Sequence, residues 1–240
     1  MPKEPLPATY QGLPLVTAQR MREIDGLSTQ KYGLKVIDLM ENAGRAVAAQ
    51  TVVFLSTLGL ELKASHVAAC CGRGANGGDG LVAARLLKQG GAEVEVFICS
   101  PKKEAGQPGE YPEPVRVNLE RAKALGIAVN LAEDEAALQQ GLGRADVVLD
   151  GLLGTGSSGK PAGSVHKVIQ AITRSKKPVV AIDLPSGIHP DTGYHSGVYV
   201  TAALTLTLGL PKRGLVTPHA RKYVGELKVL DIGFPKELMR

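Results

Sequence analysis

Short apolar runs alternate with amphipathic segments along most of the chain. The apolar runs predict strands at residues 66–71, 93–99, 127–131, 146–150, 178–183, 203–208 and 226–233. Between most of them, apolar residues recur at three-to-four spacing, which predicts helices at residues 80–89, 114–125, 133–140 and 163–175. Strands and helices alternating at these lengths form right-handed βαβ units. We therefore predict an α/β fold with a doubly wound, mostly parallel sheet in a three-layer α/β/α arrangement.

Two further helical patterns precede the first strand. Thr17 is a plausible N-cap for the first, which continues to about residue 33, and the second runs from Lys35 to about Leu58. We expect both helices to pack against the sheet. Residues 1–14 are rich in proline and predict an extended N-terminal arm. With no internal repeat or linker, residues 15–240 read as a single domain.

Charge and composition narrow the possible partners. The 28 Lys+Arg and 23 Asp+Glu give 28 − 23 = +5, but the basic residues are scattered and form no stripe. Aromatic residues are scarce (3 Phe, 6 Tyr, no Trp), which argues against a stacking platform for single-stranded nucleic acid. The charge therefore suits a solvated surface or an anionic ligand, and nucleic acid is an unlikely partner.

Cysteine content and hydropathy bear on location. Three cysteines are odd in number and too few for a disulfide framework, which favours a reducing compartment. No apolar run reaches the roughly 18 residues that a bilayer span needs. The first residues contain no apolar segment typical of a secretory signal. We expect a cytoplasmic protein that makes no contact with a membrane.

Glycine-rich loops follow neighbouring strands of the predicted sheet. In a sheet of order 3-2-1-4-5, strands one, four and five are adjacent, and ligands bind beyond their carboxyl ends. The loops there are residues 72–80, 151–163 and 184–193. Residues 72–77 and 154–159 each match G-x-G-x-x-G, whose glycines let backbone amides approach a phosphate. The loops predict a phosphate-bearing ligand, unless the glycines only form tight turns.

The second strand lacks the acidic residue that holds a ribose hydroxyl in dehydrogenases. It ends at Ser100 and is followed by Pro101, Lys102 and Lys103. A conventional hydride-transfer enzyme is therefore disfavoured. An NADP-linked oxidoreductase stays open as an alternative, because of the two glycine loops and this lysine pair.

Three oxygen-bearing side chains stand at neighbouring strand ends. Asn76, Asp150 and Ser186 would suit a hard cation, because such ions prefer oxygen ligands. Equally, Asp150 and Ser186 could cap local turns. Zinc is not expected, since no Cys/His cluster has its spacing. Hydrolysis by a nucleophilic serine is also not expected, since no G-x-S-x-G motif is present.

Two carboxyls are the first candidates for acid–base chemistry. Asp183 ends a fully apolar strand, where desolvation should raise its pKa and allow proton transfer near neutrality. Asp79 is the second candidate, although it could simply be the N-cap of the helix it opens. Lys160 and His189 rank behind them, and His189 fits a surface loop as well.

Six motifs together resemble one known family, the NAD(P)H-hydrate epimerases of the YjeF N-terminal type. They are LMENAG (39–44), GRGANGGDG (72–80), LDGLLGTG (149–156), AIDLPSGI (181–188), LGLPKRGL (208–215) and GELKVLDIGFP (225–235). The resemblance covers roughly residues 15 to 235. One departure is Ala75, where the family usually has asparagine, so a hydrogen bond from that side chain to substrate is absent here.

The resemblance implies a Rossmann-like fold that interconverts the R and S forms of NADHX and NADPHX, which are NADH and NADPH hydrated at C6. A separate ATP- or ADP-dependent dehydratase would then restore the cofactor; it is often fused to the C-terminus, and since this chain stops at Arg240 we expect a separate protein. The resemblance also implies a homodimer, for which the N-terminal helices are the candidate interface.

The resemblance assigns residues to substrate, ion and catalysis. Asp183 is the expected catalytic acid/base, and Asn76, Asp150 and Ser186 would bind K⁺. Substrate binding falls to Ala75, Asn76, Gly77, Gly78, Asp79, Gly154, Thr155, Gly156, Ser157, Ser158, Gly159, Lys160 and Asp183. The expected reaction is loss of the C6 hydroxyl as water, pushed by the ring nitrogen, and return of water to either face. The alternative is a non-catalytic nucleotide- or RNA-binding scaffold on the same fold, which Ala75 favours.

Overall fold

A seven-stranded parallel sheet forms the centre of the computed structural model, which describes residues 6–102, 109–157 and 159–240. Its strand order is β5-β4-β3-β6-β7-β8-β9, with every neighbouring pair parallel. The strands are β3 (His66–Cys71), β4 (Glu93–Ile98), β5 (Ala128–Leu131), β6 (Val147–Gly151), β7 (Val179–Ile182), β8 (Leu204–Leu208) and β9 (Glu226–Leu230). The predicted doubly wound α/β fold and the order 3-2-1-4-5 of its first five strands are confirmed.

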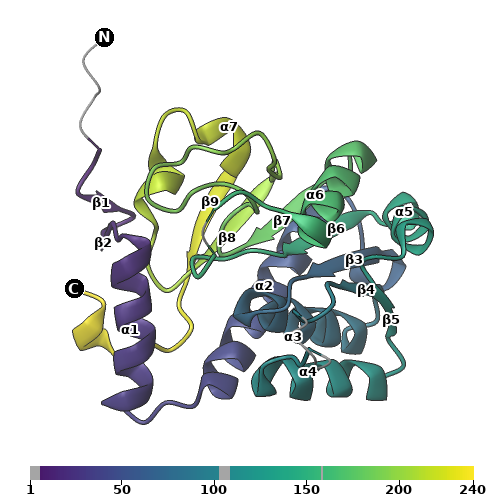
Figure 1. The fold of residues 1–240 in the computed structure, drawn as a ribbon, viewed down its shortest axis with the longest axis horizontal. Helices are drawn as coiled ribbons and strands as arrows, with labels where there is room; N and C mark the ends of the chain where they lie inside the picture. The colour runs from purple at the N-terminus through teal and green to yellow at the C-terminus, as the bar shows by residue number, and fades with distance from the viewer. Residues whose placement is uncertain (1–5, 103–108, 158) are drawn as a thin grey trace.

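Helices cover both faces of the sheet (Figure 1). One apolar core joins the sheet to α2 (Val36–Thr57), α3 (Ala75–Gln89) and α4 (Glu113–Ala124). A second core joins the other face to α5 (Glu135–Arg144) and α6 (Gly163–Ser175). A short helix, α7 (Arg221–Val224), precedes β9. No helix within the described residues is both long and apolar enough to span a bilayer.

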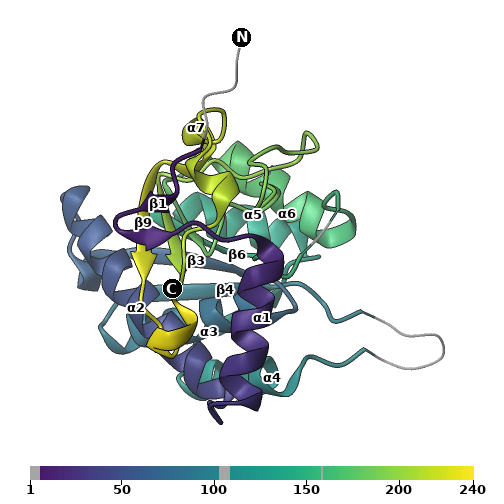
Figure 2. The same cartoon turned by 90° about the vertical axis from the view of Figure 1, so that its left-hand side faces the viewer.

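The first helix, α1 (Ala18–Gln30), packs through Met21 and Ile24 against the main core, as predicted. It does so from beyond the carboxyl ends of the strands rather than within either helix layer (Figures 1 and 2). The predicted N-cap is confirmed, since Thr17 Oγ1 accepts the N–H of Arg20 at 3.1 Å. Parallel pairing of Val16 with Lys212 fixes the start of α1, because Val16 N–H donates to the Pro211 carbonyl at 3.0 Å. The loop after β8 thus places α1 at the edge of the sheet.

Two other segments differ from the predicted pattern. Helix α3 begins at Ala75, well before the predicted start at Gly80. Glycine disfavours helix, so the local pattern missed its first turn, which is fixed by tertiary packing. In the predicted extended arm, residues 1–5 lie outside the described residues. Thr9–Tyr10 (β1) and Leu13–Pro14 (β2) pair as a small antiparallel hairpin.

Candidate active site at the carboxyl edge of the sheet

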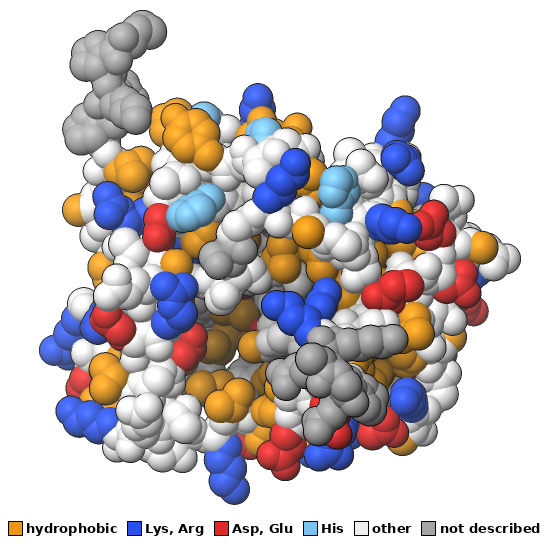
Figure 3. Space-filling model, in the orientation of Figure 1, with side chains coloured by type: hydrophobic (Ala, Val, Ile, Leu, Met, Phe, Trp, Pro, Cys, Tyr) orange, Lys and Arg blue, Asp and Glu red, His pale blue; other side chains and the backbone are white. Residues whose placement is uncertain are grey.

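A cleft of about 840 Å³ opens at the carboxyl ends of β3, β6, β7 and β8. Its floor is formed by the loops that follow these strands and by the start of α3, and α1 forms its outer wall. Figure 3 shows this face of the molecule hollowed beside α1. The volume lies in the range of small-molecule and cofactor sites. The cleft is at the position that the strand order predicts for a ligand.

Close backbone packing brings the start of α3 to the cleft. A Cβ at Gly77 would overlap the carbonyl oxygen of Gly72, and a Cβ at Gly78 would overlap the side chain of Met40. Gly77 lets α3 approach the end of β3, and Gly78 lets it approach α2. Neither residue is part of the cleft lining. Their role in substrate binding stays a prediction. Ala75 and Asn76, in the first turn of α3, do line it.

Replacing Gly77 by Ala should therefore destabilise the fold, by about 2–3 kcal/mol, since overpacking against rigid backbone has no cheap relief. The matched control is Gly74→Ala, because a Cβ at Gly74 meets nothing within 4 Å. We expect that control to cost about 1 kcal/mol or less, as a poorer N-cap of α3. Chemical denaturation of both variants measures this; equal losses would contradict the packing described.

Asp183 is held in a fixed and strained position after β7. Its φ of 69° lies in the left-handed region, which non-glycine residues rarely adopt. Its Oδ2 accepts the N–H of Thr155 at 2.8 Å and the Thr155 hydroxyl at 2.6 Å, and its Oδ1 accepts a proton of the Lys212 ammonium. Burial opposes ionisation, but Lys212 and these hydrogen bonds outweigh it, so the pKa of Asp183 lies below its usual value. The predicted rise in this pKa is wrong.

Lys212, which sequence reasoning gave no role, is the cation at the base of the cleft. Its side chain is 1% exposed and also donates to Thr207 Oγ1 at 3.1 Å and to the Leu208 carbonyl at 2.7 Å. All three protons of the ammonium thus have acceptors. A lysine in the loop that follows an apolar strand, inside the motif LGLPKRGL, is the signal that points to it.

Asp79 presents a carboxyl with no hydrogen-bond partner among the described residues. It lies within α3 rather than at its N-cap, which is Gly74, so the capping alternative is wrong. The residue is 7% exposed and lines the cleft. Burial raises its pKa well above the usual value, and the charges of Asp183 and Asp25 add to this rise. Burial thus favours the protonated form of Asp79, in the same cleft as the fixed carboxylate of Asp183.

Asp25 brings a third carboxyl to the cleft, from α1. The residue is exposed to solvent within the cleft. Partial burial of its carboxyl raises the pKa to about 6, the charge of Asp183 adds to the rise, and the charge of Lys212 opposes it. No pattern in the sequence indicates this role. Asp25 follows Arg22 and Glu23 on an amphipathic helix, a pattern typical of a solvated face.

The predicted cation ligands lie at one place, and two of them bond directly. The Ser186 hydroxyl donates to Asp150 Oδ1 at 2.7 Å, and the Ser186 N–H donates to Asp150 Oδ2 at 2.8 Å. Asp150 also accepts the N–H of Leu152, which is the predicted capping of the turn. Asn76 donates to the Ile182 carbonyl at 3.1 Å, while its buried Oδ1 has no partner. Burial raises the pKa of Asp150 to about 6, opposed by these hydrogen bonds.

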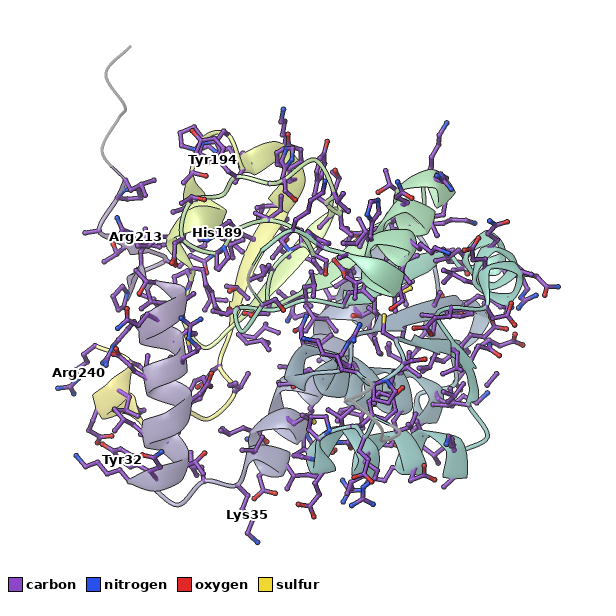
Figure 4. The ribbon with its side chains drawn as sticks, viewed as in Figure 1. Tyr32, Lys35, His189, Tyr194, Arg213 and Arg240 are labelled. Carbon is purple, nitrogen blue, oxygen red and sulfur yellow. The ribbon has the colours of Figure 1, made fainter. Side chains whose placement is uncertain are left out.

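The second glycine loop lines the cleft along most of its length. Its lining residues are Gly154, Thr155, Gly156, Ser157, Gly159 and Lys160, whereas Ser158 lies outside the described residues. A Cβ at Gly154 would lie 3.0 Å from Asp183 Oδ2, so glycine leaves the access to that carboxylate open. His189 does not line the cleft: it is exposed in the loop beside the start of α1 (Figure 4), where its Nδ1 accepts the N–H of Asp191 at 3.1 Å.

Both acidic and basic side chains line the cleft. The acids lie around Lys212, whereas further cleft-lining cations come from other loops and from α1: Arg22, Arg73, Lys102 and Lys160. These cations and the N-terminus of α3 favour an anionic ligand. The cleft thus offers cations for phosphates and carboxyls for proton transfer.

The chain is similar in sequence and fold to proteins of one known family. The family described as "YjeF-related protein N-terminus" matches residues 36–214. An NAD(P)H-hydrate epimerase of Elusimicrobium minutum is 35% identical over 226 residues, covering 93% of this chain and 97% of that protein. The crystal structure of the yeast protein ynu0 superposes with a TM-score of 0.76 at 25% identity, covering 91% of this chain and 88% of that one.

Longer proteins match as well. The bifunctional NAD(P)H-hydrate repair enzyme Nnr of Thermofilum pendens is 44% identical over 219 residues, which are 90% of this chain but 39% of that protein. The chain spans about two fifths of the length of such bifunctional relatives. The family match, the relatives and the shared fold agree with the motifs, and the chain belongs to the YjeF-related N-terminal family.

Proposed function

We propose that this chain is an NAD(P)H-hydrate epimerase, which interconverts the R and S forms of NADHX and NADPHX. The observation that carries the proposal is the lining of one cleft by Asp79, whose pKa burial raises, by the fixed Asp183 carboxylate, and by cations and glycine-rich loops that suit phosphates. Full-length relatives named NAD(P)H-hydrate epimerase support it, since they match at 35–36% identity over more than 90% of this chain.

The arrangement suits reversible loss of a hydroxyl next to a ring nitrogen. A carboxylic acid protonates the leaving hydroxyl, and the nitrogen lone pair forms a C=N bond, which leaves a planar cation. A fixed carboxylate stabilises that cation because its position is set before the charge develops. In this account Asp183 is catalytic as an anion, and Asp79 supplies the proton.

We further propose that Asn76, Asp150 and Ser186 hold K⁺. The unpartnered, buried Oδ1 of Asn76 fits this role, because an orphaned buried oxygen is costly unless it meets a donor or an ion. Within the described residues no group of three His, Cys, Asp or Glu side chains could hold a metal. A set of one carboxylate and two neutral oxygens suits a hard ion of low charge. The bound ion would supply fixed positive charge that orders the loops after β3, β6 and β7.

Potassium should therefore stabilise the fold. At a K⁺ concentration of about five times its Kd, we expect about 1 kcal/mol, or a rise in Tm of about 2–4 °C. The comparison is a sodium salt at equal ionic strength, and Asn76→Ala should remove the difference between the two salts. Thermal denaturation checks this; a difference of equal size in Asn76→Ala would show that the ion binds elsewhere.

Separation of the two epimers by chromatography tests the proposed activity. Purified protein should bring R-NADHX to equilibrium with the S form faster than the spontaneous reaction does. The scaffold alternative predicts no acceleration, together with RNA retention in a filter-binding assay that falls as salt rises. The oxidoreductase alternative predicts an absorbance change with ordinary NADPH.

The cellular setting follows from the same proposal. Three free, buried cysteines suit the reducing cytoplasm, where we place the protein. We propose a homodimer through the N-terminal helices, where Val36 and Val53 of α2 are exposed. The relatives named bifunctional repair enzymes support a functional link to the ATP- or ADP-dependent dehydratase that acts on the S form.

A further inference from the structure

Carboxyls approach the cleft from two separate walls. Asp79 belongs to α3 and Asp25 belongs to α1, and both residues line the cleft. Figure 1 shows α1 and α3 as separate elements, with α3 among the helices that cover the sheet. In Figure 4, α1 extends from the region of Arg213 to the turn at Tyr32 and Lys35. Neither Asp79 nor Asp25 has a hydrogen-bond partner for its carboxyl among the described residues. Both are therefore free to bond with a ligand between the walls.

The wall formed by α1 is held in place. Met21 and Ile24 are buried in the main core, the Ala18 N–H donates to Asp191 Oδ1 at 2.6 Å, and Val16 pairs with Lys212. The Arg22 guanidinium donates to the Thr155 carbonyl at 3.4 Å, which ties the helix to the loop that also holds Asp183. The position of Asp25 is thus determined by the same segments that fix Asp183.

Inversion at C6 needs proton transfer on both faces of the ring. Water that leaves from one face must be protonated there, and water that returns to the opposite face must lose a proton on that side. A single carboxyl lies on one face only. An enzyme that inverts this centre through a planar cation therefore requires an acid on one wall and a base on the other.

We propose that Asp25 is the second catalytic acid/base of this reaction, acting on the face of the ring opposite Asp79. The inference rests on the proposed epimerase function. Asp183, with both oxygens already bonded, is the fixed anion between the two and transfers no proton. One epimer presents its hydroxyl to Asp79 and the other presents it to Asp25.

The proton and electron balance is complete within the site. In one direction the Asp79 carboxyl gives its proton to the C6 hydroxyl, the C6–O bond breaks, and the nitrogen lone pair forms the N1=C6 bond. Water then attacks C6 from the α1 side, its proton passes to the Asp25 carboxylate, and the N1=C6 electrons return to nitrogen. The proton has moved from Asp79 to Asp25; the reverse reaction, or exchange with solvent, restores the starting state.

The charges that face Asp25 agree with this role. Lys212 from the loop after β8 favours its carboxylate, Asp183 and Asp79 from the sheet side oppose it, and Arg22 is its neighbour on α1. With a pKa of about 6, Asp25 is mostly ionised at neutral pH. Burial raises the pKa of Asp79, which favours its protonated form. The two carboxyls thus suit the roles of base and acid.

Isotope exchange in Asp25→Asn tests the proposal. In H₂¹⁸O, the wild-type protein should invert C6 and incorporate solvent oxygen together. Asp25→Asn should lose inversion by at least about 100-fold. It should still catalyse exchange of the C6 oxygen without inversion in one epimer, because Asp79 can protonate the hydroxyl and take the proton back on one face. The matched control is Glu23→Gln on the same helix, whose exposed carboxylate bonds with Gln19 and Arg20 of that helix.

The possible results are distinct. Inversion by Asp25→Asn at the wild-type rate overturns the proposal. Equal loss of inversion and exchange also overturns it, provided that thermal denaturation shows the variant folded, because a merely structural role predicts that outcome. We expect it to stay folded, since Asn removes a charge that the cleft disfavours. A wild-type protein that accelerates neither process overturns the epimerase function itself.

Discussion

Replacing Lys212 by Met is expected to destabilise the protein by about 3–5 kcal/mol at pH 8, because it leaves the Asp183 carboxylate buried without its counter-ion. Thr207 and the Leu208 carbonyl lose a hydrogen bond as well. Methionine fills much of the same volume, so the loss measures charge and hydrogen bonding rather than a cavity. Chemical denaturation gives the free energy of unfolding.

The loss of stability in Lys212→Met should depend on pH through the ionisation of Asp183. In the wild-type protein the pKa of Asp183 is lowered, so the ion pair contributes stability above the unfolded-state pKa of about 3.9 and loses it as pH falls through the folded-state pKa. Without Lys212, burial raises the pKa of Asp183, and the variant can protonate that carboxyl at mildly acidic pH. The loss should therefore be smaller at pH 5 than at pH 8.

The double variant Lys212→Met/Asp183→Asn provides the control. With neither charge present, no unpaired ion is buried, and part of the stability should return. A loss in Lys212→Met that is the same at both pH values, or a strictly additive double variant, would show that the two residues are not coupled.

Replacing Asp183 by Asn should lower the rate of epimerisation by about 10²–10³-fold while binding stays measurable. The reason is the loss of the fixed negative charge that stabilises the cationic intermediate, an effect of the size found for other preorganised charges. Activity is followed by separation of the epimers, and binding of NADPHX by calorimetry. Asp38→Asn, in the exposed first turn of α2, removes a carboxylate elsewhere and should leave the rate unchanged.

Two further observations complete that test. Thermal denaturation is needed, because an amide nitrogen in place of Asp183 Oδ2 would face the N–H of Thr155. Full activity in a folded Asp183→Asn would rule out a catalytic role for this residue. If Asp183→Asn kept its activity while Asp25→Asn lost inversion, Asp25 would be required and Asp183 would not. That result would contradict the mechanism above.

The sequence predicted the sheet and the position of the cleft because both follow from local patterns. Apolar runs mark buried strands, and glycine-rich loops at adjacent strand ends mark a ligand site. It missed the start of α3 because Gly77 and Gly78 are poor helix formers locally and are required by packing against Gly72 and Met40.

Local sequence patterns could not predict the roles of Asp25, Asp183 and Lys212 in the cleft. Whether the pKa of Asp183 rises or falls depends on Lys212, which approaches from the loop after another strand. Asp25 looks like a surface residue until α1 is placed beyond the sheet rather than on its face. Both facts concern distances between segments far apart in the chain, and no spacing within one motif encodes them.

The most direct test of the central claim is to mix the purified protein with R-NADHX in H₂¹⁸O and follow both epimers and their oxygen isotope over time. We expect equilibration of R and S well above the spontaneous rate, with solvent oxygen incorporated at each inversion. No acceleration by a folded protein that still binds the hydrate would contradict the proposed activity. Inversion that retains the original oxygen would contradict loss and return of water.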